Sequence, residues 1–368
     1  MILEKPFISS SVRKLCLFRQ VRVAYFRLGI VNKIQVSKIN YLDRYMEIRG
    51  WRMPLVLTMS REWDIIENRY VEEINKFKEI RLMKPVLKRA VLAAAMVAVI
   101  ISGVLAINLG LNRNIYVTRY RYSSDKIPEE FNGYKIAVIS DVHNSKYFGR
   151  IIECLDRENA DALIFAGDMI QLPDTDLDNV IKIVKAERGK SEILAVFGNH
   201  EASNGAAERR VIAGRLKENG VSVLMNSSAD IERGGARLRL IGIEDVSDEL
   251  IDDTELEKIK KTTEKNASPD TCNILICHRA SLYPYIKNLP VDLIISGHLH
   301  GGIIRLPFIG GVIGDAEKRI LPRYTSGVYK EGDGTAEMIV SRGCDYNLKK
   351  MRFFNPPEIP VITLERGD

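Results

Sequence analysis

The stretch Ile294-Ile295-Ser296-Gly297-His298-Leu299-His300-Gly301-Gly302 joins an apolar run to a turn that carries two histidines. An apolar run followed by turn residues predicts a buried β-strand that opens onto a loop. Neutral imidazole is a common ligand of zinc, iron and manganese, and the glycines allow a sharp backbone turn beside an ion. The stretch therefore suggests a metal site at a strand end, although the two histidines taken alone are also compatible with an ordinary polar loop.

The chain has five histidines, and the three outside this stretch also follow strand-like apolar runs. They are His143, His200 and His278. A further run of the same kind ends in Gly167-Asp168. Because ligands of α/β proteins collect beyond the carboxyl ends of the strands, these strand ends predict one convergent site.

The sequence after residue 133 alternates strand-like runs with helical patterns, which predicts α/β layering. The expected strands are residues 135–140, 163–166, 193–197, 221–224, 238–244, 273–277 and 293–296. The expected helices are residues 150–159, 177–186, 207–219, 254–261 and 280–287. After Gly302 the pattern changes to short strands at 303–306, 336–341 and 361–364, joined by Gly/Pro turns. Two packed mixed sheets flanked by helices fit this order.

Five motifs, taken in order, resemble those of the calcineurin-like metallophosphoesterases. They are Asp141-x-His143, Gly167-Asp168, Gly198-Asn199-His200-Glu201, His278 and Gly297-His298-x-His300. The resemblance covers residues 134–364 and is closest to a membrane-anchored bacterial branch, which has a similar hydrophobic segment before the domain and late stretches such as Ser326-Gly327-Val328-Tyr329. It implies a four-layer α-β-β-α sandwich.

The resemblance also implies two divalent cations and the hydrolysis of a phosphate ester by a hydroxide that bridges them. In this assignment Asp168 binds both ions. The first ion is completed by Asp141, His143 and His300, and the second by Asn199, His278 and His298. Nitrogen and oxygen ligands without thiolate suit Mn, Fe, Zn or Co.

Other residues near these motifs are candidates for supporting roles. We assign His200 to protonating or steadying the leaving-group oxygen. Asn144 and Arg305 are candidates for contact with the substrate phosphate, and each could instead be a surface loop residue. Glu201 either orients a ligand or is an exposed residue of a first helical turn. Ile303 stands where many relatives of this family have Gln, so a hydrogen bond of those relatives is missing here.

Residues 90–112 contain no charged side chain and are rich in Ala, Val, Ile and Leu. At about 1.5 Å per residue, this length crosses a hydrocarbon core of about 30 Å, which predicts one transmembrane helix. Six Lys/Arg residues lie in the flank before it and four in the flank after it. This excess favours a cytoplasmic N-terminus, which would place the catalytic domain outside the cytoplasmic membrane.

These patterns divide the chain into a basic segment (1–84), a transmembrane anchor (85–112), a stem (113–132) and a metallophosphoesterase domain (133–368). Residues 1–89 hold 19 Lys/Arg and 9 Asp/Glu, a net charge of +10, whereas residues 127–368 hold 31 and 38, a net charge of −7. Apolar residues at helical spacing predict an amphipathic helix over residues 60–80. An alternative hypothesis is that translation begins at Met83, in which case the basic segment is not made.

The main interpretation is a membrane-tethered hydrolase of a phosphate monoester, phosphodiester or pyrophosphate, and the anchor favours a lipid-linked substrate. A lipid-linked hydrolase similar to the UDP-2,3-diacylglucosamine pyrophosphatases is an alternative that needs a site on the cytoplasmic side. A metallonuclease is a second alternative, but the net charge of −7 argues against nucleic acid as a partner. A non-catalytic scaffold is a third, and the seven intact ligand positions argue against it.

Overall fold

The computed structural model describes residues 45–48, 51–54, 68–69, 71–72, 85–245, 252–313, 320–345 and 352–367. The chain divides into two compact units, Met1–Leu92 and Ala93–Asp368. In the first unit, β1 (Tyr45–Ile48) and β2 (Trp51–Pro54) form an antiparallel pair. Most of the amphipathic helix expected over residues 60–80 lies outside the described residues, of which 68–69 and 71–72 are helical.

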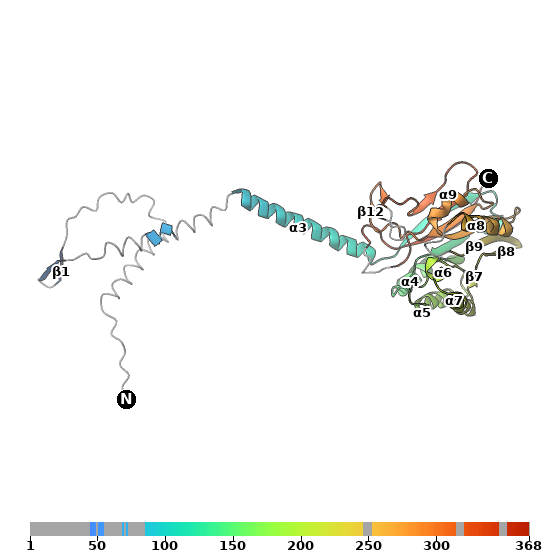
Figure 1. Cartoon of the computed structure of the whole chain (residues 1–368), viewed down its shortest axis with the longest axis horizontal. Helices are drawn as coiled ribbons and strands as arrows, with labels where there is room; N and C mark the ends of the chain where they lie inside the picture. The colour runs from blue at the N-terminus through green and yellow to red at the C-terminus, as the bar shows by residue number, and fades with distance from the viewer. Residues whose placement is uncertain are drawn as a thin grey trace, which may run out of the picture. The chain divides into compact units, whose positions relative to one another are not determined.

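A single long helix, α3 (Pro85–Asn112), contains the whole uncharged run (Figure 1). Among the described residues, its part Leu87–Asn112 is the one helix long and apolar enough to cross a membrane, with a mean hydropathy of 2.7. Its large apolar side chains are exposed, including Leu92, Val99 and Ile107. A helix that is apolar on every side and unburied by protein suits lipid better than water.

The first sheet has the strand order β3-β16-β4-β5-β6-β7. Its strands are β3 (Tyr116–Ser124), β16 (Glu358–Arg366), β4 (Lys135–Ile139), β5 (Ala162–Ala166), β6 (Glu192–Val196) and β7 (Ser222–Val223). The four strands from β4 to β7 are parallel. Their connections include α4 (Phe148–Glu158), α5 (Asp178–Glu187) and α7 (Ala206–Glu218), which lie together on one side of the domain in Figure 1.

The second sheet has the strand order β14-β15-β11-β10-β9-β8. Its strands are β14 (Gly327–Tyr329), β15 (Glu337–Val340), β11 (Leu293–Gly297), β10 (Asn273–Arg279), β9 (Ala236–Ile243) and β8 (Ser227–Arg233). The four central strands are parallel, and the two edge strands are antiparallel to their neighbours. The helical elements after β9 and β10 are α8 (Asp253–Asn266), η2 (Ala280–Leu282) and α9 (Tyr283–Ile286).

Alternating residues of the central strands enter different hydrophobic cores, as the two-residue period of a strand requires. On β4, Ile136 and Val138 belong to a core that combines residues of both sheets, whereas Ala137 and Ile139 belong to the core shared with α4, α5 and α7. A third core lies between the second sheet and its helices. The expected α/β fold with two sheets flanked by helices is thus confirmed.

The segment expected as a stem is part of the folded domain. Strand β3 pairs with β16 along its full length, from Tyr116 opposite Glu358 to Ser124 opposite Arg366. Ile127 and Phe131, which follow it, are fully buried in the core between the sheets. Strand β3 lies at the edge of the sheet and needs only one apolar face, so its sequence mixes polar and apolar residues and was not predicted as a strand.

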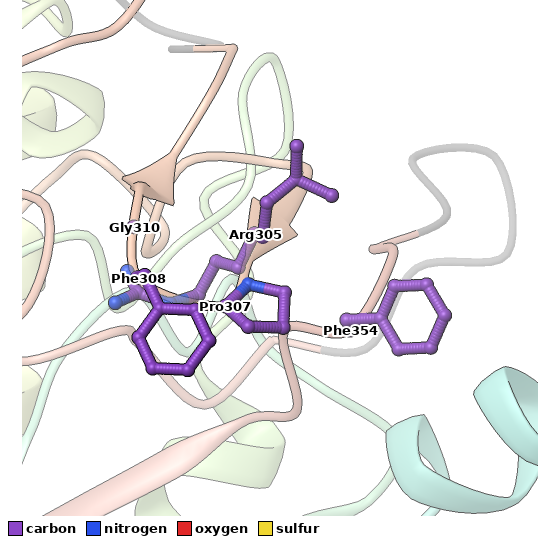
Figure 2. Close-up of a pocket in the computed structure, with 6 residues that line it drawn as sticks. Arg305, Pro307, Phe308, Gly310 and Phe354 are labelled. Atoms are coloured by element: carbon purple, nitrogen blue, oxygen red, sulfur yellow. The ribbon is translucent and has the colours of Figure 1, made fainter.

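The strand expected at residues 303–306 is shorter than predicted. Only β12 (Arg305–Leu306) forms, and it pairs with β13 (Gly310–Gly311) in a small hairpin. This hairpin and Phe354 line a shallow hollow at the surface (Figure 2).

Candidate metal centre

The seven predicted ligands lie on loops and strand ends at one edge of the two packed sheets. They are Asp141 and His143 after β4, Asp168 after β5, Asn199 at the start of α6 (Asn199–Ala202), His278 near the end of β10, and His298 and His300 after β11. Neighbouring parallel strands end at the same edge, which explains why residues far apart in sequence meet here.

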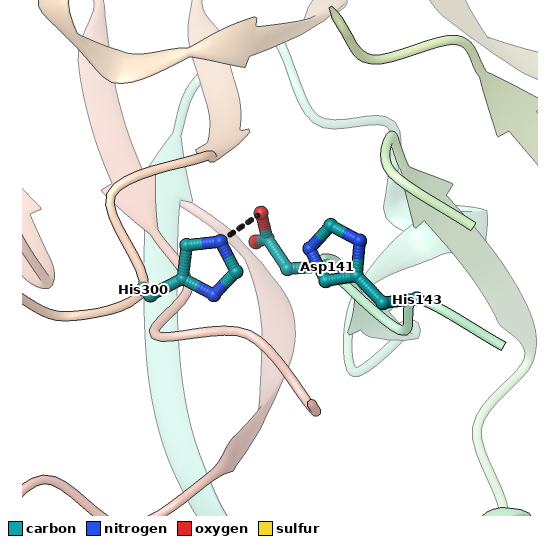
Figure 3. Close-up of side chains that lie close together, drawn as sticks. All are labelled: Asp141, His143 and His300. Carbon is teal, nitrogen blue, oxygen red and sulfur yellow. Dashed lines mark ion pairs between the residues drawn. The ribbon is translucent and has the colours of Figure 1, made fainter. Parts of the chain in front are cut away.

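Six of these ligands and His200 form three groups that could each hold a metal ion, with ligand atoms within 4.8 Å of one another. The groups are Asp141, His143 and His300; His143, Asp168 and His200; and Asp168, His278 and His298. In the first group, the carboxylate of Asp141 lies between two histidine rings (Figure 3), and its Oδ1 is 3.6 Å from Nε2 of His300. Since the groups share His143 and Asp168, they form one continuous cluster.

The carboxylate of Asp168 occupies the middle of this cluster. Its Oδ2 lies 3.3 Å from Nε2 of His278 and 3.9 Å from Nε2 of both His143 and His200. Its Oδ1 accepts a hydrogen bond from the backbone N–H of His200 (2.9 Å). Asp168 therefore lies within reach of histidines from two of the three groups.

Three buried polar atoms of this cluster have no hydrogen-bond partner among the described residues: Oδ1 of Asp141, Oδ1 of Asn199 and Nε2 of His278. Two of them, on Asp141 and His278, are 3.8 Å apart. An unpaired buried polar group destabilises a fold by about 1–3 kcal/mol, so three in one cluster need a ligand. Carboxylate, amide and imidazole atoms without thiolate fit a divalent cation.

The backbone is strained at the ligands. Five of the seven have positive φ angles: Asp141 (52°), His143 (47°), Asp168 (55°), His298 (76°) and His300 (48°). A non-glycine residue in this region costs about 1–3 kcal/mol, and such residues collect at functional sites. At each of these residues the backbone leaves the extended conformation of the strand, and the side chain belongs to the cluster.

Two glycines of the motifs are required by the close approach of these side chains. A Cβ atom at Gly198 would collide with Asp168, and one at Gly167 would collide with His278. Gly167 also has a φ of 94°, which side-chain-bearing residues rarely adopt. The Gly-Asp and Gly-Asn-His sequences thus follow from packing as well as from ligand chemistry.

Hydrogen bonds to backbone carbonyls fix the rings of two histidines. Nδ1 of His278 is 2.7 Å from the carbonyl of Ala166, and Nδ1 of His143 is 3.1 Å from that of Ile170. In each ring, Nε2 is left facing the carboxylates. Partners of this kind set the tautomer and the ring orientation of metal-binding histidines.

Asp345 fixes the orientation of the His300 ring through its Nδ1 atom. This residue was not predicted from the sequence. Its Oδ1 lies 3.2 Å from Nδ1 of His300 and also binds the guanidinium of Arg352. Burial favours the neutral acid, but the charge of Arg352 outweighs it and holds the pKa of Asp345 well below its usual range. The residue follows no strand-end motif, so no local signal marks it.

Glu201 links the loops that carry the ligands. Its carboxylate accepts hydrogen bonds from the backbone N–H groups of Asp168 (3.0 Å), Ile170 (2.9 Å) and Gly198 (2.8 Å). Burial, with the nearby charge of Asp168, raises the pKa of Glu201 to about 8. The alternative of an exposed residue is wrong, because Glu201 is fully buried.

The electrostatics of the cluster favour a positive charge at its centre. Burial alone would lower the pKa of His278, but the carboxylates of Asp168 and Asp141 raise it to about 10. Burial holds the pKa of His298 well below its usual range, and it also lowers that of His200. The two carboxylates thus favour a positive charge beside them, which a bound cation would supply.

A buried ion pair lies beside His298 and was also not foreseen. Nε of Arg279 is 2.7 Å from Oδ1 of Asp245, and Nη1 of Arg279 is 3.5 Å from Nε2 of His298. Its only sequence signal is that Arg279 directly follows the ligand His278.

The remaining candidates differ in how free they are to meet a substrate. Nδ1 of His200 accepts the backbone N–H of Leu172 (3.2 Å), which leaves the proton on Nε2, the atom nearest Asp168. The side chain of Asn144 donates to Asp176 (2.8 Å) and accepts from the N–H of Asn179 (3.0 Å), so both of its polar atoms hold the start of α5.

Arg305 is bound to the loop that carries two of the ligands. Its Nη1 donates to the carbonyl of Gly301 (2.8 Å) and to Oγ1 of Thr325 (3.1 Å). This places the guanidinium next to the His298–His300 turn, with part of its donor capacity already used.

Comparisons with known proteins agree with this geometry. Residues 134–302 match the family model of the calcineurin-like phosphoesterases. The chain is 29% identical over 259 residues to metallophosphoesterase YkuE of Bacillus subtilis, covering 68% of this chain and 86% of the relative. It is 22% identical over 382 residues to a transmembrane protein with metallophosphoesterase domain from Bos taurus, covering 99% of this chain and 76% of the relative.

A shorter similarity, 30% identity over 100 residues, relates it to the UDP-2,3-diacylglucosamine pyrophosphatase LpxG of Chlamydia muridarum and covers 26% of this chain and 30% of that protein. The fold and the strand-end cluster define a hydrolase of phosphate esters. Residues 134–302 form a calcineurin-like phosphoesterase domain, as the motifs predicted.

Proposed function

We propose that this protein is a membrane-anchored phosphoesterase that holds two divalent cations. The observation that carries the proposal is that Asp168 joins the group of His278 and His298 to His143, which itself belongs to the group of Asp141 and His300. One ion would be held by Asp141, His143 and His300 with Asp168. The other would be held by Asn199, His278 and His298, again with Asp168. The mixed donors leave Mn, Fe, Zn and Co as candidates.

When bound, a pair of cations supplies Lewis-acid activation of water and of the phosphate ester. The chain's own residues supply the rigid frame for that chemistry. Glu201 fixes the Asp168 and Gly198 loops relative to each other, and Asp345 fixes the ring of His300. Groups fixed before the substrate arrives do not have to reorganise during the reaction.

His200 is proposed to steady the oxygen of the leaving group. Its Nε2 carries the proton, because Nδ1 accepts the N–H of Leu172. About a fifth of the side chain is exposed, so a substrate can reach the ring. Burial lowers the pKa of His200 and so favours the neutral ring, whose Nε2–H can donate a hydrogen bond that stabilises negative charge on the leaving oxygen.

The membrane anchor narrows the choice of substrate. Helix α3 would cross the bilayer, and the distribution of Lys and Arg around it favours a cytoplasmic N-terminus and a domain on the opposite face. A site held beside a bilayer meets phosphate groups of lipids more often than those of soluble esters. The local similarity to LpxG supports a lipid-linked substrate, although its reaction would require the opposite orientation.

The decisive experiment measures metal content and turnover on the same full-length protein in lipid nanodiscs. After chelation and reloading with manganese, we expect two ions per chain and hydrolysis of bis-p-nitrophenyl phosphate. Asp168→Asn should lose bound metal and should lose hydrolysis of the ester. Asp156→Asn is the matched control, because this carboxylate lies on α4 and pairs with Lys190 at the surface (2.6 Å). Full turnover by Asp168→Asn would refute the proposal, and a single bound ion in the active protein would refute its dinuclear form.

A further inference from the structure

The hairpin β12–β13 and the segments next to it expose a group of large apolar side chains. We call this group the hairpin patch; it consists of Leu306, Phe308, Ile309, Ile320, Leu321 and Phe354. Phe308 is fully exposed, and Ile320 is 81% exposed. Large contiguous apolar patches on a protein surface mark sites of interaction.

These side chains come from three segments whose backbones contact one another. Leu306, Phe308 and Phe354 line the same hollow of about 570 Å³ (Figure 2). Leu321 donates its backbone N–H to the carbonyl of Val312 (2.8 Å), which joins the third segment to the hairpin. None of these side chains is a predicted ligand or catalytic residue, so neither role explains why they are exposed.

The patch is tied to the end of the candidate membrane span. The side chain of Asn108 accepts the backbone N–H of Phe354 (2.8 Å) and donates to the carbonyl of Arg352 (2.9 Å). The side chain of Asn112 donates to the same carbonyl. Asn108 precedes the end of α3 by four residues, which is about 6 Å along the helix axis.

A bilayer crossed by α3 would therefore end close to the level of Phe354. The first charged residue after the apolar run is Arg113, so the headgroups would begin near the end of the helix. Apolar side chains of interfacial segments enter a bilayer by about 5–10 Å. That depth matches the position of Phe354, whose backbone binds Asn108 about 6 Å before the end of the helix.

We infer that the hairpin patch is a second membrane contact, in which its apolar side chains enter the headgroup region of the bilayer that α3 crosses. The inference rests on the proposed membrane span of α3. The patch is also connected to the cluster: Arg305, at the base of the hairpin, binds the carbonyl of Gly301, and Asn355 binds the carbonyl of His300 (2.6 Å). Contact with lipid would thus hold the candidate metal centre beside headgroup phosphates.

The test uses the full-length chain in lipid nanodiscs with one fluorescent label per chain. The label is attached to a cysteine at Phe308 (Phe308→Cys), at Val99 within the span (Val99→Cys), or at Val211, an exposed aliphatic residue on α7 (Val211→Cys). Cys16 is replaced by serine in each protein, and the four cysteines of the described domain are buried thiols. The measurement is quenching by lipids that carry a nitroxide near the headgroup or deep in the acyl chain.

We expect the label at Phe308 to be quenched strongly by the shallow nitroxide and the label at Val99 by the deep one, with little quenching at Val211. Adding Ile309→Asp should reduce the quenching at Phe308, because a charge opposes insertion. Quenching at Phe308 no stronger than at Val211, with Val99 still quenched, would overturn the inference.

Energy transfer between labels on two chains without lipid quenching would also overturn it, because a second copy would then cover the patch. If Val99 is not quenched either, the proposed span itself fails and the inference fails with it. None of these readouts requires turnover, so they do not depend on whether the cluster hydrolyses esters.

Discussion

Replacement of Asp345 by asparagine tests whether the residues around the cluster set its affinity for metal. Asp345 is buried and holds Nδ1 of His300 at 3.2 Å, while the guanidinium of Arg352 keeps it charged. Asparagine has nearly the same shape, but it removes the negative charge. The amide oxygen of asparagine is a weaker acceptor, so the ring of His300 would lose the charged partner that orients Nε2 toward Asp141.

The expected size of the effect follows from this single contact. Loss of a hydrogen-bonding partner behind a metal-binding histidine typically weakens metal affinity by about 10–100-fold. That range corresponds to about 1.4–2.7 kcal/mol of binding free energy. We expect it for the ion held by Asp141, His143 and His300, and a much smaller change for the other ion.

The assay is a competition between the protein and a chelating dye for manganese, which resolves the two affinities. Asp230→Asn is the matched control, because Asp230 also pairs with an arginine, Arg239 (2.7 Å), but on β8 and away from the cluster. Both variants lose an Asp–Arg pair, so an effect of that loss alone would appear in both. The reasoning is refuted if two results are found together. The first is that Asp345→Asn binds both ions as tightly as Asp230→Asn does, and the second is that the two variants lower the unfolding temperature by the same amount.

Three further variants test other parts of the account. His200→Ala should keep its metal content and lose about 10²–10³ in kcat on an alkyl phosphodiester, with a smaller loss on a p-nitrophenyl ester, whose leaving oxygen carries less negative charge; equal losses would contradict the role of His200 at the leaving oxygen. Gly198→Ala should lose bound metal, because its Cβ would collide with Asp168, whereas Gly149→Ala meets no atom within 4 Å and should bind normally. Arg239 holds the pKa of Asp230 below its usual value through their hydrogen bond, so this pair stabilises the fold at neutral pH and loses that contribution as acid titrates Asp230; urea unfolding of Arg239→Met and wild type should therefore differ at pH 7 and converge on acidification.

The sequence predicted the central strands and the cluster because both leave local signals. Each parallel strand is a short apolar run, and each ligand follows such a run within a few residues. Parallel neighbours end at one edge, so the meeting of Asp141, Asp168 and His298 could be expected from the sequence alone. The family resemblance added the division of ligands between two ions.

Other features depend on contacts between distant segments and left no such signal. Strand β3 is recognisable only through its partner β16, which is near the other end of the chain. Asp345 acts on His300 from the loop after β15, where neither its residue type nor its spacing indicated a contact with His300. Asn144 looked available for phosphate, but its side chain holds the start of α5 through Asp176 and Asn179. Local sequence patterns show which residue types are present, whereas only the fold shows which of their polar atoms already have hydrogen-bond partners.

The two sheets contribute separate halves of the cluster, which links metal binding to their packing. Asp168 comes from the first sheet and His278 from the second, and their closest atoms are 3.3 Å apart. The sheets pack on each other through an apolar core, whose attraction has no directional preference. Ions bound by residues of both sheets would fix the sheets in one register, and they would satisfy the buried atoms of Asp141 and Asn199 that the protein leaves unpaired. The strained backbone at the ligands is consistent with this, since strain of that kind persists where the surrounding structure and its ligands over-determine the conformation.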